Sequence, residues 1–268
     1  MLGVSALICR WPTWVVFGLV ALSWTRAWGG AVPWALVAAG WVAAVAALAA
    51  ASAWACLRGF APAYCRLRSA KSAVALTFDD GPDPESTPRV LDELGRHGAH
   101  ATFFVVGTKA AAYPQLLQRM IREGHEVACH GHRHDWRALL SVRRVTADLA
   151  ACVEAVTAAT GSRPRYYRPP YGVTTPALGV ALTSSGLDLV GWSRRSWDTM
   201  GRDSPAARAA RLGARVEPGD IILLHDAPER QGGRTPAGPD VLALVLSHLA
   251  TRRLRAEAVG GIERGAPV

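Results

Sequence analysis

Acidic residues are missing from the N-terminal part of the chain. Residues 1–71 carry six arginines and lysines but no aspartate or glutamate, in a chain of 268 residues with a net charge of +9. Residues 72–268 therefore hold 24 basic against 21 acidic side chains, a net charge of only +3. Because the basic excess is confined to one end and no strip of basic and aromatic residues is present, the sequence excludes a nucleic-acid partner.

Cysteine is scarce and irregularly spaced. The chain has five cysteines, an odd number, and no CxxC pair. This pattern predicts neither a disulfide framework nor a zinc knuckle. Cys129 adjoins a histidine, but we interpret it as a small buried strand residue rather than a ligand. The five positions are Cys9, Cys56, Cys65, Cys129 and Cys152.

Charged residues are also absent from a long N-terminal run. Residues 27–57 are 31 consecutive uncharged positions, rich in Ala, Val, Leu and Trp. Because a transmembrane helix needs about 20 such residues, we predict a hydrophobic membrane-anchor region at residues 1–60. It has one or two spans, because the shorter run 11–25 fits a first span, an interfacial helix or a signal-like core. A basic linker is expected at 61–71.

Strand and helix signals alternate from residue 72 onward. Such alternation predicts βαβ units with parallel strand pairing. About seven parallel strands in residues 72–262 fit an α/β fold of the distorted (β/α) barrel type. The predicted strands are 74–78, 101–106, 125–129, 165–168, 187–192, 220–224 and 254–259.

Two adjacent carboxylates follow the first of these strands directly. Asp79 and Asp80 repel each other, so both stay ionised only if a cation lies against one of them. His130 and His134 are four residues apart, and on a helical turn both imidazoles face the same way, as metal ligands must. One carboxylate and two histidines leave coordination positions open, which favours a hydrolytic metal over a structural one. The alternative for each motif alone is a solvated turn or a surface histidine pair.

The polar motifs share one position relative to the strands. Each lies at or just past the carboxyl end of a predicted strand, and in a parallel barrel those ends converge on one rim. We therefore predict a single site. Its members are Asp79, Asp80, His130, Arg168, Trp192 and His225.

These motifs resemble those of the polysaccharide deacetylase family (carbohydrate esterase family four). The resemblance covers roughly residues 70–260 and includes five ordered motifs, of which the fourth is the loosest. It implies the same barrel fold and a divalent metal, with zinc expected first and cobalt or nickel as alternatives. The motifs occupy residues 77–81, 130–134, 168–172, 192–198 and 223–226.

The resemblance also implies a role for each site residue. Asp79 resembles the general base that activates water, and Arg168 is expected beside Asp79, holding it ionised. The backbone N–H of Tyr171 resembles a donor to the tetrahedral oxyanion. The implied metal ligands are Asp80, His130 and His134.

The last two motifs supply the implied acid and pocket. His225 resembles the general acid that protonates the departing amine, and Asp198 is expected beside it, fixing its tautomer and orientation. Trp192 and Leu223 resemble the walls of a small pocket for the acetyl methyl group. One departure is Arg195, which stands where the family often has a second acid.

The implied function is metal-dependent deacetylation of N-acetylated amino sugars in a cell-envelope or exported polysaccharide, peptidoglycan or chitin-like. Two alternatives stay open: a deacylase of a lipid-linked sugar at the membrane surface, and a catalytically silent glycan-binding protein. The substrate class predicts an extracytoplasmic catalytic domain, whereas the basic residues after the long run favour the cytoplasm. No obligate protein partner is evident.

Overall fold

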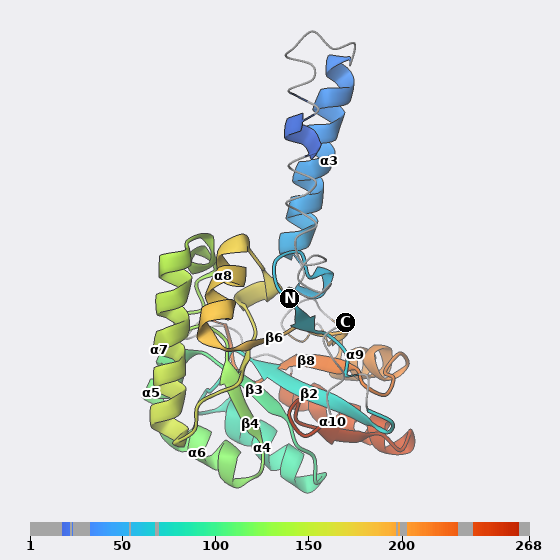
Figure 1. Cartoon of the computed structure of the whole chain (residues 1–268). Coiled ribbons are helices and arrows are strands. Elements are labelled where there is room, and N and C mark those ends of the chain that lie inside the picture. The colour runs from blue at the N-terminus through green and yellow to red at the C-terminus, as the bar shows by residue number, and fades with distance from the viewer. Residues whose placement is uncertain are drawn as a thin grey trace.

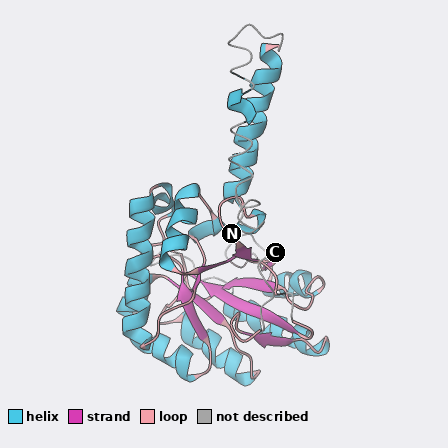
Figure 2. Ribbon diagram, viewed as in Figure 1, coloured by secondary structure: helices cyan, strands magenta, loops and turns pink. Residues whose placement is uncertain are grey.

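A parallel β-sheet forms the centre of the fold, as the computed structural model shows for residues 18–21, 23, 33–53, 55–67, 70–196, 198, 203–229 and 238–262 (Figures 1 and 2). The nine strands run in the order β1-β6-β5-β4-β3-β2-β8-β7, and β9 pairs with β2. They are β1 (Ala63–Tyr64), β2 (Ala73–Asp79), β3 (Thr102–Val105), β4 (Glu126–Cys129), β5 (Tyr166–Tyr167), β6 (Asp188–Val190), β7 (Arg194–Arg195), β8 (Ile221–His225) and β9 (Arg255–Glu257).

From β2 onward, helices connect most successive strands and cover one face of the sheet (Figure 2). They are α4 (Ser86–Arg96), α5 (Gly107–Ala112), α6 (Pro114–Arg122), α7 (Val142–Thr160), α8 (Pro176–Ser185), α9 (Pro205–Gly213) and α10 (Gly238–Thr251), and a further helix, α3 (Trp34–Ala53), precedes the first strand. Three 3₁₀ turns are η1 (Ala55–Leu57), η2 (Trp136–Leu140) and η3 (Pro170–Gly172).

The parallel α/β architecture confirms the predicted class, as a curled half-barrel. β1 and β7 lie at the two ends of the strand order, so the sheet is not closed by a strand pair between them. Seven of these nine strands were predicted from the sequence, whereas β1 and β7 were not. β1 and β7 have only two residues each, too few to leave a hydrophobic pattern.

Strand β2 shows how the sheet is buried on both faces. Val74, Leu76 and Phe78 belong to the large core that strands and helices share, whereas Ala73 and Ala75 belong to a second core without helical residues. This alternation is the period of two of a β-strand. It also places the polar residues 77 and 79 on the inner face, away from the helices.

The expected linker at 61–71 takes part in the fold. β1 pairs with β6, and the backbone N–H of Leu67 donates to the carbonyl oxygen of Gly219 at 2.8 Å. Arg66 forms ion pairs with Glu217 and Asp220. The sheet therefore begins before residue 72.

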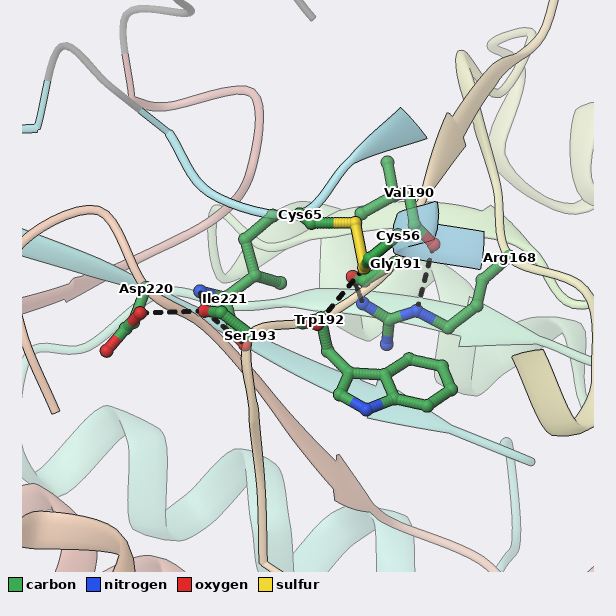
Figure 3. Close-up of a disulfide and its surroundings, with 9 residues drawn as sticks. All are labelled: Cys56, Cys65, Arg168, Val190, Gly191, Trp192, Ser193, Asp220 and Ile221. Atoms are coloured by element: carbon green, nitrogen blue, oxygen red, sulfur yellow. Dashed lines mark hydrogen bonds between the residues drawn. A yellow bond between two sulfur atoms is a disulfide. The ribbon is translucent and has the colours of Figure 1, made fainter. Parts of the chain in front are cut away.

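A disulfide between Cys56 and Cys65 corrects the interpretation of the cysteines. It joins η1 to the end of β1 and lies against the segment that follows β6 (Figure 3). The Sγ atom of Cys56 is 3.3 Å from the carbonyl oxygen of Trp192, and a Cβ at Gly191 would come within 2.8 Å of both sulfur atoms. Cys129 is buried on β4 with a free thiol, as predicted.

The predicted membrane anchor finds no support in the structure. Helix α3, within the charge-free run, extends away from the sheet (Figure 1). Among the residues with a described structure, no helix combines the length and the apolar character needed to cross a membrane. Most of the shorter run at 11–25 lies outside the described residues.

Candidate active site

Three potential metal ligands converge at the carboxyl ends of β2 and β4. Asp80 follows β2, whereas His130 and His134 follow β4. One ligand atom from each lies within 4.8 Å of the others. The Oδ1 atom of Asp80 is 3.5 Å from Nε2 of His130 and 3.1 Å from Nε2 of His134.

A loop brings the two histidines together, where the sequence predicted a helical turn. Their ring centroids are 5.0 Å apart, but residues 130–134 are not helical, and His134 has φ +53. Gly131 has φ +83, a conformation that residues with a Cβ rarely adopt. The spacing of four residues therefore correctly predicted that the two imidazoles lie together, but a loop and not a helical turn brings them there.

The second ring nitrogen of His130 fixes the orientation of the imidazole. Its Nδ1 donates a hydrogen bond to the carbonyl oxygen of Arg168 at 2.8 Å. Because a carbonyl only accepts, Nδ1 carries a proton, which leaves Nε2, on the side of Asp80, as the nitrogen that could bind a cation. This arrangement fits a cation held by Nε2.

The charge of Asp80 is also compatible with a cation. Burial would raise the pKa of its carboxyl group, but the imidazoles of His130 and His134 hold the pKa well below its usual range. An ionised oxygen with two imidazole nitrogens is a donor set that zinc, cobalt and nickel accept. The three residues thus fit a divalent metal.

Asp79 faces a fully buried arginine. Arg168, which follows β5, is 0% exposed, and its Nη1 donates to Oδ1 of Asp79 at 2.7 Å. The same Nη1 donates to Thr77, and Nη2 donates to the carbonyl oxygen of Gly191 at 2.8 Å. The guanidinium also lies 4.1 Å from the centroid of the Phe104 ring. A buried charge needs such partners, so Arg168 and Asp79 stabilise each other.

His225, at the end of β8, forms a second buried pair with Asp198. Its Nδ1 donates to Oδ1 of Asp198 at 2.9 Å, and its backbone N–H donates to Oδ2 at 2.7 Å. Burial would lower the pKa of His225, but the Asp198 carboxylate, helped by Asp80 and Asp79, raises the pKa to about 9. His225 is therefore protonated at neutral pH.

The motif at residues 168–172 contacts the motif at residues 192–198. Gly172 has φ +71, and a Cβ there would lie 2.4 Å from the indole ring of Trp192. Only glycine therefore fits between the two motifs. Tyr171, with φ +59, lies with its ring centroid 4.9 Å from that of His134. Leu223 is buried on β8 and pairs in register with Thr77 of β2.

Two residues near the site were missed by the sequence analysis. The Nζ atom of Lys109, on α5, donates to the carbonyl oxygens of Asp80 at 2.7 Å and Pro228 at 2.8 Å. Glu229 accepts a hydrogen bond from the Tyr171 hydroxyl and lies 4.0 Å from Nδ1 of His134. Lys109 could have been predicted from the sequence, because it lies shortly after the strand β3, as the recognised motifs lie after their own strands.

Sequence comparison agrees with this geometry. Residues 67–190 match the profile of the polysaccharide deacetylase family. A chitooligosaccharide deacetylase of Bradyrhizobium sp. is 40% identical over 161 residues, which cover 59% of this chain and 72% of that protein. A peptidoglycan-N-acetylglucosamine deacetylase of Bacillus cereus is 33% identical over 185 residues, which cover 69% and 66%. The chain therefore belongs to the polysaccharide deacetylase family.

Solved structures show the same fold. The Bc1960 peptidoglycan N-acetylglucosamine deacetylase has a TM-score of 0.69 at 30% identity, covering 76% of this chain and 93% of that one. A family 4 carbohydrate esterase from Streptomyces lividans has a TM-score of 0.64 at 29% identity, covering 74% and 100%. By its family the chain is a hydrolase that acts on the N-acetyl amide bonds of sugars.

Proposed function

We propose that the protein is a metal-dependent deacetylase that hydrolyses the N-acetyl amide of amino sugars in peptidoglycan or a chitin-like polysaccharide. The observation that carries this proposal is that two separate buried ion pairs flank the cluster of Asp80, His130 and His134. One pair places a carboxylate against a buried guanidinium, and the other holds an imidazole protonated. An amide hydrolase needs both a base and an acid.

In the proposed mechanism each pair has one proton-transfer role. Asp79, oriented by the hydrogen bond from Arg168, takes a proton from the attacking water. His225, oriented by Asp198, gives a proton to the departing amine nitrogen. The backbone N–H of Tyr171 donates to the carbonyl oxygen as it becomes an oxyanion.

The metal would complete this site. Asp80, His130 and His134 would hold it, through one carboxylate oxygen and two Nε2 atoms. A divalent cation, zinc in our proposal, supplies Lewis acidity and lowers the pKa of water.

Acetate release from a panel of substrates tests the function. The purified, metal-loaded chain should release acetate from peptidoglycan or from chitin oligomers. Preferred release from an N-acetylated lipid-linked sugar would instead identify a membrane-surface deacylase. Metal binding and glycan binding without acetate release from any substrate would identify a glycan-binding protein.

We propose that Trp192 and Leu223 border a pocket that fits the acetyl methyl group. Larger acyl groups should then react poorly, since one methylene in a tight apolar pocket discriminates by about 1–3 kcal/mol, or roughly 10–200-fold. The measurement compares kcat/KM for N-acetyl and N-butyryl amino sugars of equal length. Equal values would contradict this role.

We also propose an extracytoplasmic location for the catalytic domain. The Cys56–Cys65 disulfide supports it, because disulfides persist in oxidising compartments and are rare in the cytosol. A reporter that is active only in the cytoplasm, fused to Val268, should give no signal. A strong signal would rule this location out.

A further inference from the structure

The segment that follows His134 presents exposed apolar and basic side chains together. Its apolar members are 42%, 64% and 45% exposed, although large hydrophobic side chains are more often buried. Four arginines on the same segment are also exposed. We call these seven residues the 133–144 patch: Arg133, Trp136, Arg137, Leu140, Val142, Arg143 and Arg144.

The positive charge of the patch is not neutralised by described residues. None of its four guanidinium groups forms an ion pair with a carboxylate in the described part of the chain. Elsewhere on the surface such pairs are common, for example Arg89 with Asp240 and Arg211 with Asp203. The patch thus offers charge to an anionic ligand.

The backbone beneath the patch is fixed by neighbouring elements. The side chain of Asp135 accepts a hydrogen bond from the backbone N–H of Arg137 at 3.0 Å, at the start of η2. Leu139 is buried, and its carbonyl oxygen accepts from the hydroxyl of Thr175. The carboxylate of Asp148, on α7, accepts from the backbone N–H of His132 at 2.8 Å. The patch is therefore a pre-formed surface, which lowers the entropic cost of binding.

The N-terminal end of the patch lies beside the cluster of Asp80, His130 and His134. Trp136 is two residues from His134, so their Cα atoms are at most about 7 Å apart. A half-exposed indole offers a flat apolar face with a polar edge, suited to a partly apolar, partly hydroxylated surface such as a pyranose ring. The guanidinium of Arg137 lies 5.9 Å from the centroid of that indole.

We propose that the 133–144 patch binds the carboxylate-bearing part of the glycan, next to the sugar that is deacetylated. This rests on the proposed function and narrows it. Peptidoglycan carries carboxylates on its stem peptides, whereas a chitin-like chain is neutral and offers nothing to Arg143 and Arg144. The arginines thus favour peptidoglycan as the substrate.

An anionic lipid surface is the competing occupant, because tryptophan and arginine also suit the membrane interface. The location argues against it. The patch adjoins a residue of the Asp80, His130 and His134 cluster, so a bilayer seated there would cover the approach to the site. A glycan strand can occupy the patch and the site at once.

Binding to insoluble polymers tests the proposal without relying on catalysis. The full chain and an Arg143→Gln/Arg144→Gln variant are sedimented with peptidoglycan and with chitin. The variant should bind peptidoglycan about tenfold more weakly and chitin equally well. The control is Arg122→Gln/Arg215→Gln, which removes two other exposed charges that form no ion pair with described carboxylates. Trp136→Ala should weaken binding to both polymers.

Each other outcome overturns the proposal. Unchanged binding of peptidoglycan by the Arg143/Arg144 variant, or an equal loss with the control, shows that the patch does not select anionic glycan. Loss of binding to vesicles of phosphatidylglycerol, with peptidoglycan binding intact, assigns the patch to lipid. Acetate release is measured separately. Peptidoglycan binding without acetate release would contradict the proposed function, but it would leave the 133–144 patch identified as a glycan-binding surface.

Discussion

Asp79→Asn is expected to retain its metal and lose most of its activity, whereas Asp80→Ala loses the metal itself. Asp80 is the carboxylate whose oxygen faces both imidazoles, at 3.5 and 3.1 Å. Its removal leaves two histidines, fewer than the three protein ligands that are usual in catalytic zinc sites. Metal affinity and activity should fall together.

Asp79 is positioned differently. Its Oδ1 accepts from Arg168, and its Oδ2 is 3.8 Å from Nε2 of His130. An asparagine keeps an acceptor for Arg168 and removes the repulsion with Asp80, so the metal should stay bound. Activity should fall by roughly 10²–10⁴, the usual contribution of a positioned general base.

The measurement is metal stoichiometry beside acetate release for both variants. Asp92→Asn is the matched control, because Asp92 is an exposed carboxylate on α4 whose ion pair among the described residues is with Arg119. It should match the wild type in both quantities. An Asp79→Asn protein without metal, or an Asp80→Ala protein with a full equivalent, would overturn this division of roles.

The convergence of the site could be predicted because strand ends leave a clear sequence signal. β2 and β8 are fully buried strands of seven and five residues, mostly apolar, and each ends in or is followed by polar residues. A parallel sheet then brings those residues to one edge, whatever the intervening loops do. The class of the fold and the convergence of these polar residues follow from the strand ends, whereas the choice of Asp80 over Asp79 as a ligand came from the family resemblance.

Contacts made by backbone carbonyls could not be predicted in this way. Arg168 donates to the carbonyl oxygens of Val190 and Gly191, and Lys109 donates to those of Asp80 and Pro228. Every residue has a carbonyl group, so no residue type marks these acceptors. The donors carry a signal, as Lys109 after β3 shows, but their partners depend on tertiary structure.

The disulfide was missed for a related reason. Cys56 and Cys65 are nine positions apart in the sequence, and an odd total of cysteines does not indicate which two pair. Their pairing follows from the approach of η1 to β1, a strand too short to recognise. The same short strand explains why residues 61–71 resembled a linker.

A second large loss of activity is expected when the proposed general acid, His225, is removed. His225→Ala should lower the rate of acetate release by roughly 10²–10⁴ with metal retained, because it removes a positioned general acid. His225 is not among the residues whose ligand atoms converge near Asp80. A loss of metal in this variant would contradict the assignment.

Asp198→Asn should change the pH dependence of kcat. The pKa of His225 is raised to about 9, against the effect of burial, mainly by the Asp198 carboxylate. A general acid is active in its protonated form, so wild-type activity should persist to about pH 9 and fall above it. Without the carboxylate, burial dominates and the pKa of His225 falls. The alkaline decline of kcat should then begin at lower pH, and the loss should be larger at pH 8 than at pH 6.

The pH profile of kcat distinguishes this effect from simple misfolding. A structural defect would lower kcat by a similar factor at every pH, whereas loss of the carboxylate moves the alkaline limb. Asp188→Asn is the control, since Asp188 pairs with Arg165 at the surface, at the opposite end of β6 from Trp192. It should keep the wild-type profile. An Asp198→Asn profile that keeps the wild-type alkaline limb would show that Asp198 does not set the protonation of His225.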